Sequence, residues 1–358
     1  MEPTRLRIVA IGGGTGLSTL LRGLKQYVKG ESPWVIEKLS AIVTVTDEGG
    51  SSGVLRKEFG MLPPGDIRNC IVALAEEEQL LSRLFNYRFE TESALRGHSL
   101  GNLLLAALTE ITGGFESAIL AASEVLAIRG NIFPSTLADV RLRAICADGS
   151  ELLGEMAISG DPLQTTSRPI HARITRLTID PADVVPVDGA LEAIREADLI
   201  LIGPGSLYTS ILPNLVIEKI GDALRKAEAL RVYVCNVMTQ PGETDGYTAE
   251  DHLGAIIDHA GLVADVIVIN GRRPSDVLLE TYQEKKQFPV IFDVRAIRDF
   301  GVTPFFGDII SEGDFVRHDP IGLAETVFRL YERYGRRLQR IRRERVGNLQ
   351  EEAQADRS

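Results

Sequence analysis

Short, almost wholly apolar runs recur along this chain, and each is followed by a glycine-rich or polar loop and then by a stretch with helical periodicity. The five runs are Leu6–Ile11, Leu39–Val45, Ala197–Ile202, Arg231–Asn236 and Asp265–Asn270. Helices are expected from about Leu17 to Tyr27, from Asp66, Ser99 and Glu116, and at about 215–227 and 249–259. Apolar strands that alternate with helices are typical of a parallel sheet covered on both faces. The pattern therefore predicts an α/β fold, a Rossmann-like three-layer sandwich with a mostly parallel sheet.

One segment interrupts this alternation. Val140–Ala147, Glu151–Ile158 and His171–Ile179 have the pattern of strands with no helix between them. A small antiparallel β insertion at about residues 139–180 is the simplest account. Because no low-complexity linker occurs, we expect one nucleotide-binding α/β domain over residues 1–320, with this insertion inside it.

The composition sets limits on the partners and the compartment. The 358 residues include 39 basic and 50 acidic ones, which gives a net charge of −11, and the pI is near 5.1. This balance argues against nucleic acid as a partner. No run reaches the roughly 18 apolar residues that a membrane span needs, and the N-terminus lacks the features of a signal peptide. Three widely spaced cysteines favour reduced thiols, so we expect a cytoplasmic protein with no membrane span.

The C-terminal segment has a different character. Apolar residues spaced by three and four predict one amphipathic helix at residues 321–346. Eight arginines and two glutamates lie between Arg329 and Arg345, so this helix is strongly basic in an acidic chain. A docked helix with a solvated basic face is the favoured interpretation, and a contact for an acidic partner or RNA is the alternative; the apolar stripe also suggests a homodimer. Residues 347–358 are polar and are expected to be disordered.

Two of the expected strand-to-helix loops are rich in glycine. The first strand is followed by Gly12, Gly13, Gly14, Thr15 and Gly16, and the third by Gly203, Pro204, Gly205 and Ser206. Glycines let backbone N–H groups approach a phosphate closely, and a helix N-terminus adds partial positive charge. The first loop is neither a GxGxxG dinucleotide motif nor a GK[ST] phosphate loop. Two such loops suit a ligand with two phosphates, or with a phosphate and a sugar, although tight turns capped by Ser206 or Thr209 are the alternative.

The other loops at the same edge of the expected sheet, where ligands of open parallel sheets bind, carry most of the unusual polar side chains. Asp47 and Glu48 lie in a Gly/Ser-rich loop, where they could hold Mg²⁺ through water or hydrogen-bond a sugar or base. Asp66 and Ser99 are also candidate helix N-caps. The further candidate ligand contacts are Asp66, Arg68, Asn69, His98, Asn102, Asn236, Thr239, Gln240 and Asn270. No order of serine, histidine and aspartate, or of cysteine and histidine, indicates nucleophilic hydrolysis.

Together these motifs closely resemble those of the gluconeogenesis factor family (YvcK-like proteins), within the CofD-like superfamily. The resemblance covers roughly residues 6–325 and rests on the segments IVAIGGGTGLSTLLRGLK, VTVTDEGGSSG, PPGDIRN, LFNYRF, GHSLGNLLLAAL, VRLRAICADGS, GPGSLYTSILPNL, CNVMTQPGETDGYTAEDH and RHDP. The family's usual TDDGGSSGRLR is TDEGGSSGVLR here. Glu48 keeps the negative charge, whereas Val54 lacks the charge of the arginine.

The resemblance implies a protein that binds a uridine-diphosphate sugar, notably UDP-N-acetylglucosamine, and regulates cell shape and wall synthesis during growth on gluconeogenic carbon. A protein of cell-wall synthesis or its regulation would be the partner. On this hypothesis Asn236 and Thr239 contact the sugar or base, and Asp47 and Asp66 orient the ligand or a metal. The residues that would hold the diphosphate are Gly13, Gly14, Thr15, Gly205 and Ser206.

Two other hypotheses stay open. The related CofD enzymes transfer a phospholactyl group from a guanine nucleotide to a deazaflavin, and they share the glycine loop but have a TGDD-type second loop. The chain would then be an Mg²⁺-dependent phosphotransferase with Asp47 and Asp66 as its candidate catalytic residues. The third hypothesis is an interaction protein that acts through the arginine-rich C-terminal helix.

Overall fold

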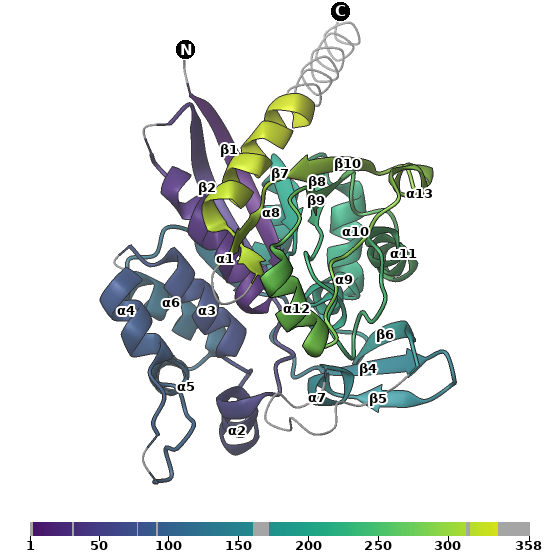
Figure 1. Cartoon of the computed structure of the whole chain (residues 1–358). Helices are drawn as coiled ribbons and strands as arrows, with labels where there is room; N and C mark the ends of the chain where they lie inside the picture. Colours follow the sequence, from purple (N-terminus) through teal and green to yellow (C-terminus); the bar gives the residue numbers. More distant parts are fainter. Residues whose placement is uncertain are drawn as a thin grey trace, which may run out of the picture.

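Seven parallel strands form the central sheet of the computed structural model, which describes residues 3–30, 32–76, 78–90, 92–159, 172–312 and 316–335. Their order is β10-β9-β8-β7-β1-β2-β3 (Figure 1). The strands are β1 (Thr4–Gly12), β2 (Trp34–Val43), β3 (Asn131–Pro134), β7 (Leu199–Ile202), β8 (Leu230–Val234), β9 (Val266–Asn270) and β10 (Thr303–Gly307). All five predicted strands lie in this sheet, while β3 and β10 were not predicted. Every pairing within it is parallel, which confirms the predicted α/β class.

Helices cover both faces of this sheet, as predicted. On one face α1 (Gly14–Leu24) packs against α3 (Gly65–Leu74); on the other, α10 (Glu218–Lys226) packs against α8 (Asp188–Glu196) and α11 (Ala249–Ala260) (Figure 1). The remaining helices of the main domain are α2 (Gly50–Phe59), α4 (Glu78–Asn86), α5 (Leu100–Thr112), α6 (Phe115–Val125), α9 (Leu212–Leu215), α12 (Asp276–Glu284) and α13 (Val294–Asp299). The central strand β1 is buried on both sides, and its residues Ile8 to Ile11 are at most 2% exposed.

The strand order reverses at β1. From β1 the chain moves outward through β2 and β3 on one side, and through β7, β8, β9 and β10 on the other. The loops after β1 and β7 therefore diverge at the carboxyl edge and leave a crevice between them, which is where open parallel sheets bind ligands. The two glycine-rich loops are the loops at this point.

The predicted antiparallel insertion is present as a sheet of three strands in the order β5-β4-β6. These are β4 (Arg141–Cys146), β5 (Glu151–Leu153) and β6 (Ile174–Asp180), and both pairings are antiparallel. The prediction of a strand up to Ile158 with no helix following it was wrong. Gly154 has a φ of +86°, which ends β5, and the short helix α7 (Glu155–Ser159) follows. The start of the third predicted strand, at residue 171, lies outside the described residues.

The C-terminal helix packs on the first face of the sheet. It follows a hairpin of β11 (Ile310–Glu312) and β12 (Val316–His318) and is described over residues 320–335. Phe328 stacks on Trp34 with 5.6 Å between ring centroids. The apolar stripe is buried at Leu323, Val327 and Leu330. This stripe therefore covers the chain's own strands and gives no argument for a homodimer. Most of the predicted basic segment, from 336 to 346 with Arg336, Arg337, Arg340 and Arg343, and the predicted tail 347–358 lie outside the described residues.

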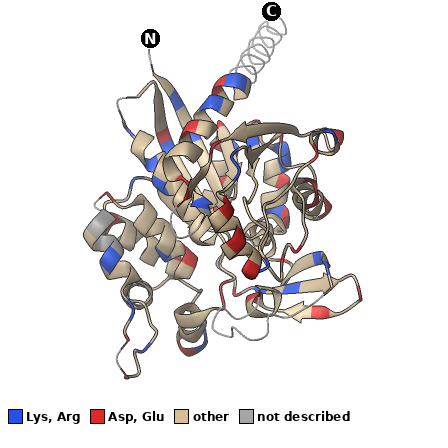
Figure 2. Ribbon diagram, in the orientation of Figure 1, with Lys and Arg blue, Asp and Glu red and all other residues tan. Residues whose placement is uncertain are grey.

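The helices and the charged residues bear on a membrane span and on binding partners. Among the described helices, none alone has the length and apolar composition to cross a membrane; α5 and α6 reach them only as a pair, bent by 117°. In Figure 2 basic residues are interspersed with acidic ones along the ribbon of the described part of the chain.

Candidate functional site

A cavity of about 700 Å³ opens at the carboxyl edge of the sheet, over the reversal point between β1 and β7. Eleven of the predicted ligand residues line it: Gly13, Gly14, Thr15, Gly16, Asp47, Asp66, Gly205, Ser206, Asn236, Thr239 and Gln240. The structure therefore brings these eleven residues together around one cavity.

The first glycine loop needs glycine for two separate reasons. Gly14 has a φ of +62°, a left-handed conformation that β-branched residues avoid. A side chain there would point into the cavity, since its Cβ would meet only the Ser210 hydroxyl, 3.6 Å away. At Gly16 a Cβ would clash with the carbonyl of Pro204. The two glycine loops therefore touch through their backbones, which any side chain at Gly16 would prevent.

The second glycine loop is held by side chains from the loop after β8. The Asn236 amide donates to the Gly205 carbonyl (2.8 Å) and accepts from the Gly205 N–H (3.3 Å). Gln240 donates to the Ser206 hydroxyl at 2.7 Å. Asn236 and Gln240 thus fix the loop as well as line the cavity, a role that the sequence did not predict.

A single turn of π-helix, Leu207–Ile211, follows this loop and is fixed by a buried acid that the sequence did not single out. Glu243 is 5% exposed, and it accepts hydrogen bonds from the Tyr208 N–H (3.1 Å) and the Thr209 hydroxyl (3.0 Å). Ser206 occupies the N-cap position but provides no side-chain cap, and the Thr209 hydroxyl donates to Glu243. The alternative that these loops are simple capped turns is therefore wrong for the second loop.

Replacing Glu243 tests this part of the site. Glu243→Ala leaves the Tyr208 N–H and the Thr209 hydroxyl buried without their acceptor, so we expect the free energy of unfolding to fall by about 2–3 kcal/mol. Urea titration of the wild type and the variant measures this difference. Glu243→Gln keeps one acceptor oxygen and should lose clearly less. An alanine variant as stable as the wild type would contradict the assigned role.

Three carboxylates face the cavity from different elements: Asp47 from the loop after β2, Asp66 from the first turn of α3, and Glu155 from α7. Burial and then repulsion from Asp47 raise the pKa of Asp66 to about 7, although the Gly14 N–H donates to it. Burial and Asp47 also raise the pKa of Glu155 well above its usual value. Glu155 accepts a hydrogen bond from the Glu48 N–H at 2.9 Å. The site therefore places three carboxyl groups together, and burial and their proximity oppose the ionisation of Asp66 and Glu155.

Asp66 is not the N-cap of its helix, contrary to one prediction. The cap position of α3 is Pro64, and no side chain accepts a hydrogen bond there. Asp66 instead turns its carboxylate toward the first glycine loop, whose Gly14 N–H it accepts. Ser99 does cap α5, since its hydroxyl accepts from the Asn102 N–H at 3.1 Å.

The donor set near Asp47 and Asp66 limits the metal chemistry. No three His, Cys, Asp or Glu side chains of the described residues converge as a metal cluster. Two neighbouring carboxylates are nevertheless what Mg²⁺ commonly uses when water and ligand phosphates complete its shell. Asp47 and Asp66 therefore fit a magnesium ion that arrives with a phosphorylated ligand.

Arg317 and His318 from β12 also line the cavity, and the sequence motif that contains them was not assigned a role. Burial lowers the pKa of His318 to about 4, so the ring is neutral at pH 7. Arg317 is then the one permanent cation among the described lining residues. The remaining unpredicted lining residues are Thr209, Ser210, Val237, Met238, Tyr282 and Gln287.

Four predicted ligand residues form a separate polar cluster behind the Asp47 loop. Arg68 donates to the Ser99 hydroxyl (2.6 Å) and to the side-chain amide oxygen of Asn69 (2.8 Å). His98 pairs with Ser51 at 3.1 Å and Asn102 donates to Ser52 at 3.3 Å. The residues of this cluster that were predicted to bind ligand are Arg68, Asn69, His98 and Asn102, and none of them lines the cavity. They join the N-terminal ends of α2, α3 and α5.

The last three predicted residues also lie outside the lining. The Gly12 carbonyl accepts from Asn214 at 3.1 Å, and Gly203, with a φ of +80°, donates its N–H to Ile11 at 2.8 Å. Both glycines shape the turns that carry the lining residues. Asn270 lines a neighbouring cavity of about 230 Å³ together with Arg272 and Arg273.

The fold and the cavity define an α/β protein with two glycine turns at the reversal point of a parallel sheet. The family model described as 2-phospho-L-lactate transferase CofD matches residues 8–310. A putative gluconeogenesis factor of Aquifex aeolicus is 48% identical over 92% of this chain and 97% of its own length. The gluconeogenesis factor of Bacillus subtilis is 45% identical over 90% of this chain and 96% of its own.

A solved structure agrees with these relatives. The crystal structure of a UPF0052-family protein from Bacillus halodurans matches with a TM-score of 0.83 and 45% identity, over 91% of this chain and 99% of that one. The chain belongs to the gluconeogenesis factor group of the CofD family. The predicted resemblance is thereby confirmed.

Proposed function

We propose that this protein is a cytoplasmic regulator that binds a UDP-sugar, UDP-N-acetylglucosamine, and adjusts carbon flow into the cell wall during gluconeogenic growth. The observation that carries the proposal is the cavity of about 700 Å³ between the two glycine loops. Its volume lies in the range of small-molecule sites. The names of the relatives support the metabolic setting.

The chemistry of the lining suits the two halves of such a ligand. The N-terminus of α1 and the backbone around Gly14 and Gly205 face the cavity and would hold the diphosphate. Amide and hydroxyl groups of Asn236, Thr239 and Gln240, beside the second glycine loop, would hydrogen-bond the sugar or base. A partner protein of cell-wall synthesis or its regulation would bind the ligand-bound form of this protein.

A diphosphate beside three carboxylates requires positive charge. Among the described lining residues only Arg317 supplies it permanently, so we expect Mg²⁺ to accompany the ligand, held by Asp47 and Asp66. Bound there, the ion would neutralise charge on the phosphates. The pKa of Asp66 is raised first by burial and then by the neighbouring Asp47 carboxylate.

Chelation tests this expectation. Isothermal titration with UDP-N-acetylglucosamine should give at least an approximately tenfold weaker Kd in EDTA than with excess Mg²⁺, because a lost charge-assisted contact is worth about 1.5–3 kcal/mol. Asp47→Asn should reduce the difference between the two conditions. Equal affinity with and without Mg²⁺ would show that the ligand binds without a metal.

A second candidate function is a phospholactyl transferase of the CofD type, which the family-model match over residues 8–310 favours. Asp47 and Asp66 would then be catalytic residues. Incubation with a guanine-diphosphate phospholactate donor and a deazaflavin acceptor tests it. We expect no transfer; steady turnover that Asp47→Ala abolishes would replace the binding proposal.

A further inference from the structure

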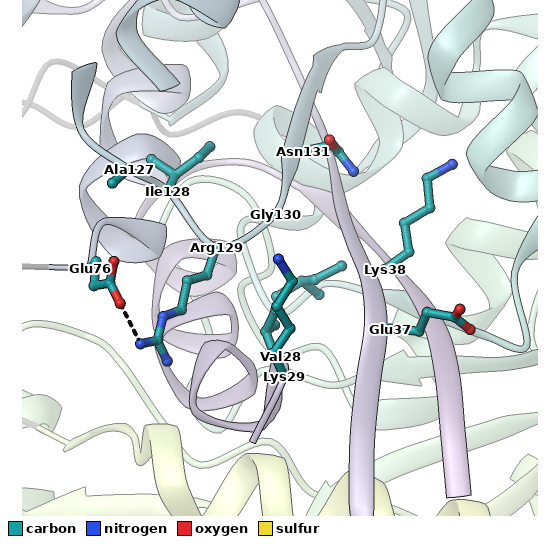
Figure 3. A pocket seen from close by; sticks show the side chains of 11 residues that line it. Val28, Lys29, Glu37, Lys38, Glu76, Ala127, Ile128, Arg129, Gly130 and Asn131 are labelled. Carbon is teal, nitrogen blue, oxygen red and sulfur yellow. Dashed lines mark hydrogen bonds and ion pairs between the residues drawn. The ribbon is translucent and has the colours of Figure 1, made fainter. Parts of the chain in front are cut away.

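A second cavity, of about 500 Å³, lies beside the amino-terminal halves of β2 and β3, away from the carboxyl edge that carries the candidate site (Figure 3). Its walls come from four separate parts of the chain: 28–29, 37–39, 76 and 127–131. The volume is within the usual range of small-molecule sites. None of its residues belongs to the cavity between the glycine loops.

The outer edge of β2 forms one wall and has no strand partner there. Val28 makes a single parallel bridge with Ile36, and β3 pairs with β2 only from Ser40 onward. Residues 37–39 lie against β1 on one edge, and in the described part of the chain no strand lies against their outer edge. Backbone donors and acceptors on this edge are therefore open to a ligand.

The backbone around the cavity is irregular in three places. The register of β2 against β1 shifts by one residue at Glu37, which is a bulge, and bulges commonly re-aim side chains near binding sites. Lys29 and Ala127 are two of the three described non-glycine residues with positive φ, at +56° and +45°. Such strain persists only where the surroundings hold it, and it is frequent at ligand sites.

This cavity is lined by three basic residues, Lys29, Lys38 and Arg129, and by two acidic ones, Glu37 and Glu76. Figure 3 shows Lys29 between Arg129 on one side and Lys38 on the other. Arg129 pairs with Glu76 at 2.7 Å and Lys38 with Glu196 at 3.0 Å, and both pairs are partly exposed. Exposed ion pairs are weak and exchange readily for another anion. Lys29 forms no ion pair with a described residue.

We propose that this cavity binds a small phosphorylated or carboxylated metabolite. Its anionic group lies between Lys29 and Arg129, and its polar groups hydrogen-bond the open edge of β2. The protein would then sense a second metabolite at a site separate from the glycine loops.

Isothermal titration of the full chain with pyrophosphate and with citrate tests the proposal and distinguishes the two kinds of anion. We expect at least one probe to bind, and Lys29→Asn and Arg129→Gln each to weaken it about tenfold, since each removes a charge-assisted contact. Asparagine tolerates the left-handed backbone at position 29. Lys57→Asn, which removes an exposed lysine of α2, should bind like the wild type.

Pyrophosphate could also bind the glycine loops, so the Gly14→Val variant is used to distinguish binding at this cavity from binding at the first one. Binding that survives Gly14→Val and is lost in both charge variants supports the second site. Thermal unfolding confirms that each variant is folded. The proposal would be overturned if neither probe binds at millimolar concentration. It would also be overturned if both charge variants bind with unchanged affinity, or if only Gly14→Val loses binding.

Discussion

A Gly14→Val variant should fold and yet lose the stabilisation that UDP-N-acetylglucosamine gives the wild type. A valine side chain at this position would occupy the space between the two glycine loops. A Cβ on residue 14 points into the cavity, where the Ser210 hydroxyl is its only neighbour within 4 Å. Valine also disfavours the φ of +62°, at a cost of about 1–2 kcal/mol. Titration of UDP-N-acetylglucosamine should give no measurable heat.

Gly60→Val is the matched control for this change. Gly60 has a φ of +61°, lies exposed at the end of α2 and has no atom within 4 Å of its would-be Cβ. Both variants therefore carry similar backbone strain, but only Gly14→Val blocks the cavity. Gly60→Val should melt at a similarly lowered temperature and still bind the ligand. If the two variants bind equally well, the glycine loop does not hold the phosphates.

Asp66→Asn should make the unliganded protein more stable above pH 7 while it weakens ligand binding. The pKa of Asp66 rises from 3.8 to about 7 in the folded state, so between these values the folded protein binds a proton that the unfolded chain has lost. Stability from this group therefore falls as the pH rises from about 4 to about 7, and above 7 the cost amounts to about 2–4 kcal/mol. The amide removes the cost and still offers an oxygen to the Gly14 N–H.

Urea unfolding of wild type and Asp66→Asn across this pH range measures the effect. The stability difference should be small near pH 4 and grow in favour of the variant up to about pH 8. Asp188→Asn, an exposed acid in the first turn of α8, serves as the control and should show no such growth. If the difference in the free energy of unfolding does not change with pH, then burial and Asp47 do not raise the pKa of Asp66.

The main sheet was predictable because its central strands are continuous apolar runs. β3 and β10 escaped prediction for physical reasons. β3 has only four residues, and its sequence NIFP ends in proline; β10 begins TPF, with proline inside the strand. Both are edge strands of the sheet, where proline is tolerated.

The sequence identified the loops of the site better than the orientation of the side chains in them. Arg68, His98 and Asn102 lie near the starts of helices, as several lining residues do, but they turn inward and hold neighbouring helix ends. Asp66 does the reverse, since it faces the cavity instead of capping α3. Spacing along a chain does not distinguish these two orientations.

Residues contributed to the cavity by distant segments were not predicted, although the motif RHDP contains two of them. Glu155 reaches the cavity from the insertion, in a stretch that the sequence assigned to a strand. Arg317 arrives from β12, more than a hundred residues after the second glycine loop. Only the three-dimensional arrangement brings these charges beside Asp47.

The central claim is that the cavity between the glycine loops binds a UDP-sugar, and thermal unfolding of the wild type with three nucleotides tests it most directly. A ligand that binds only the folded state adds about 2.7 kcal/mol at 100 times its Kd, which raises the Tm by a few degrees for a chain of this size. UDP-N-acetylglucosamine with Mg²⁺ should give this rise, and GDP or NAD at the same concentration should not. A protein that ignores UDP-N-acetylglucosamine and is stabilised by GDP would contradict the account and favour the transferase.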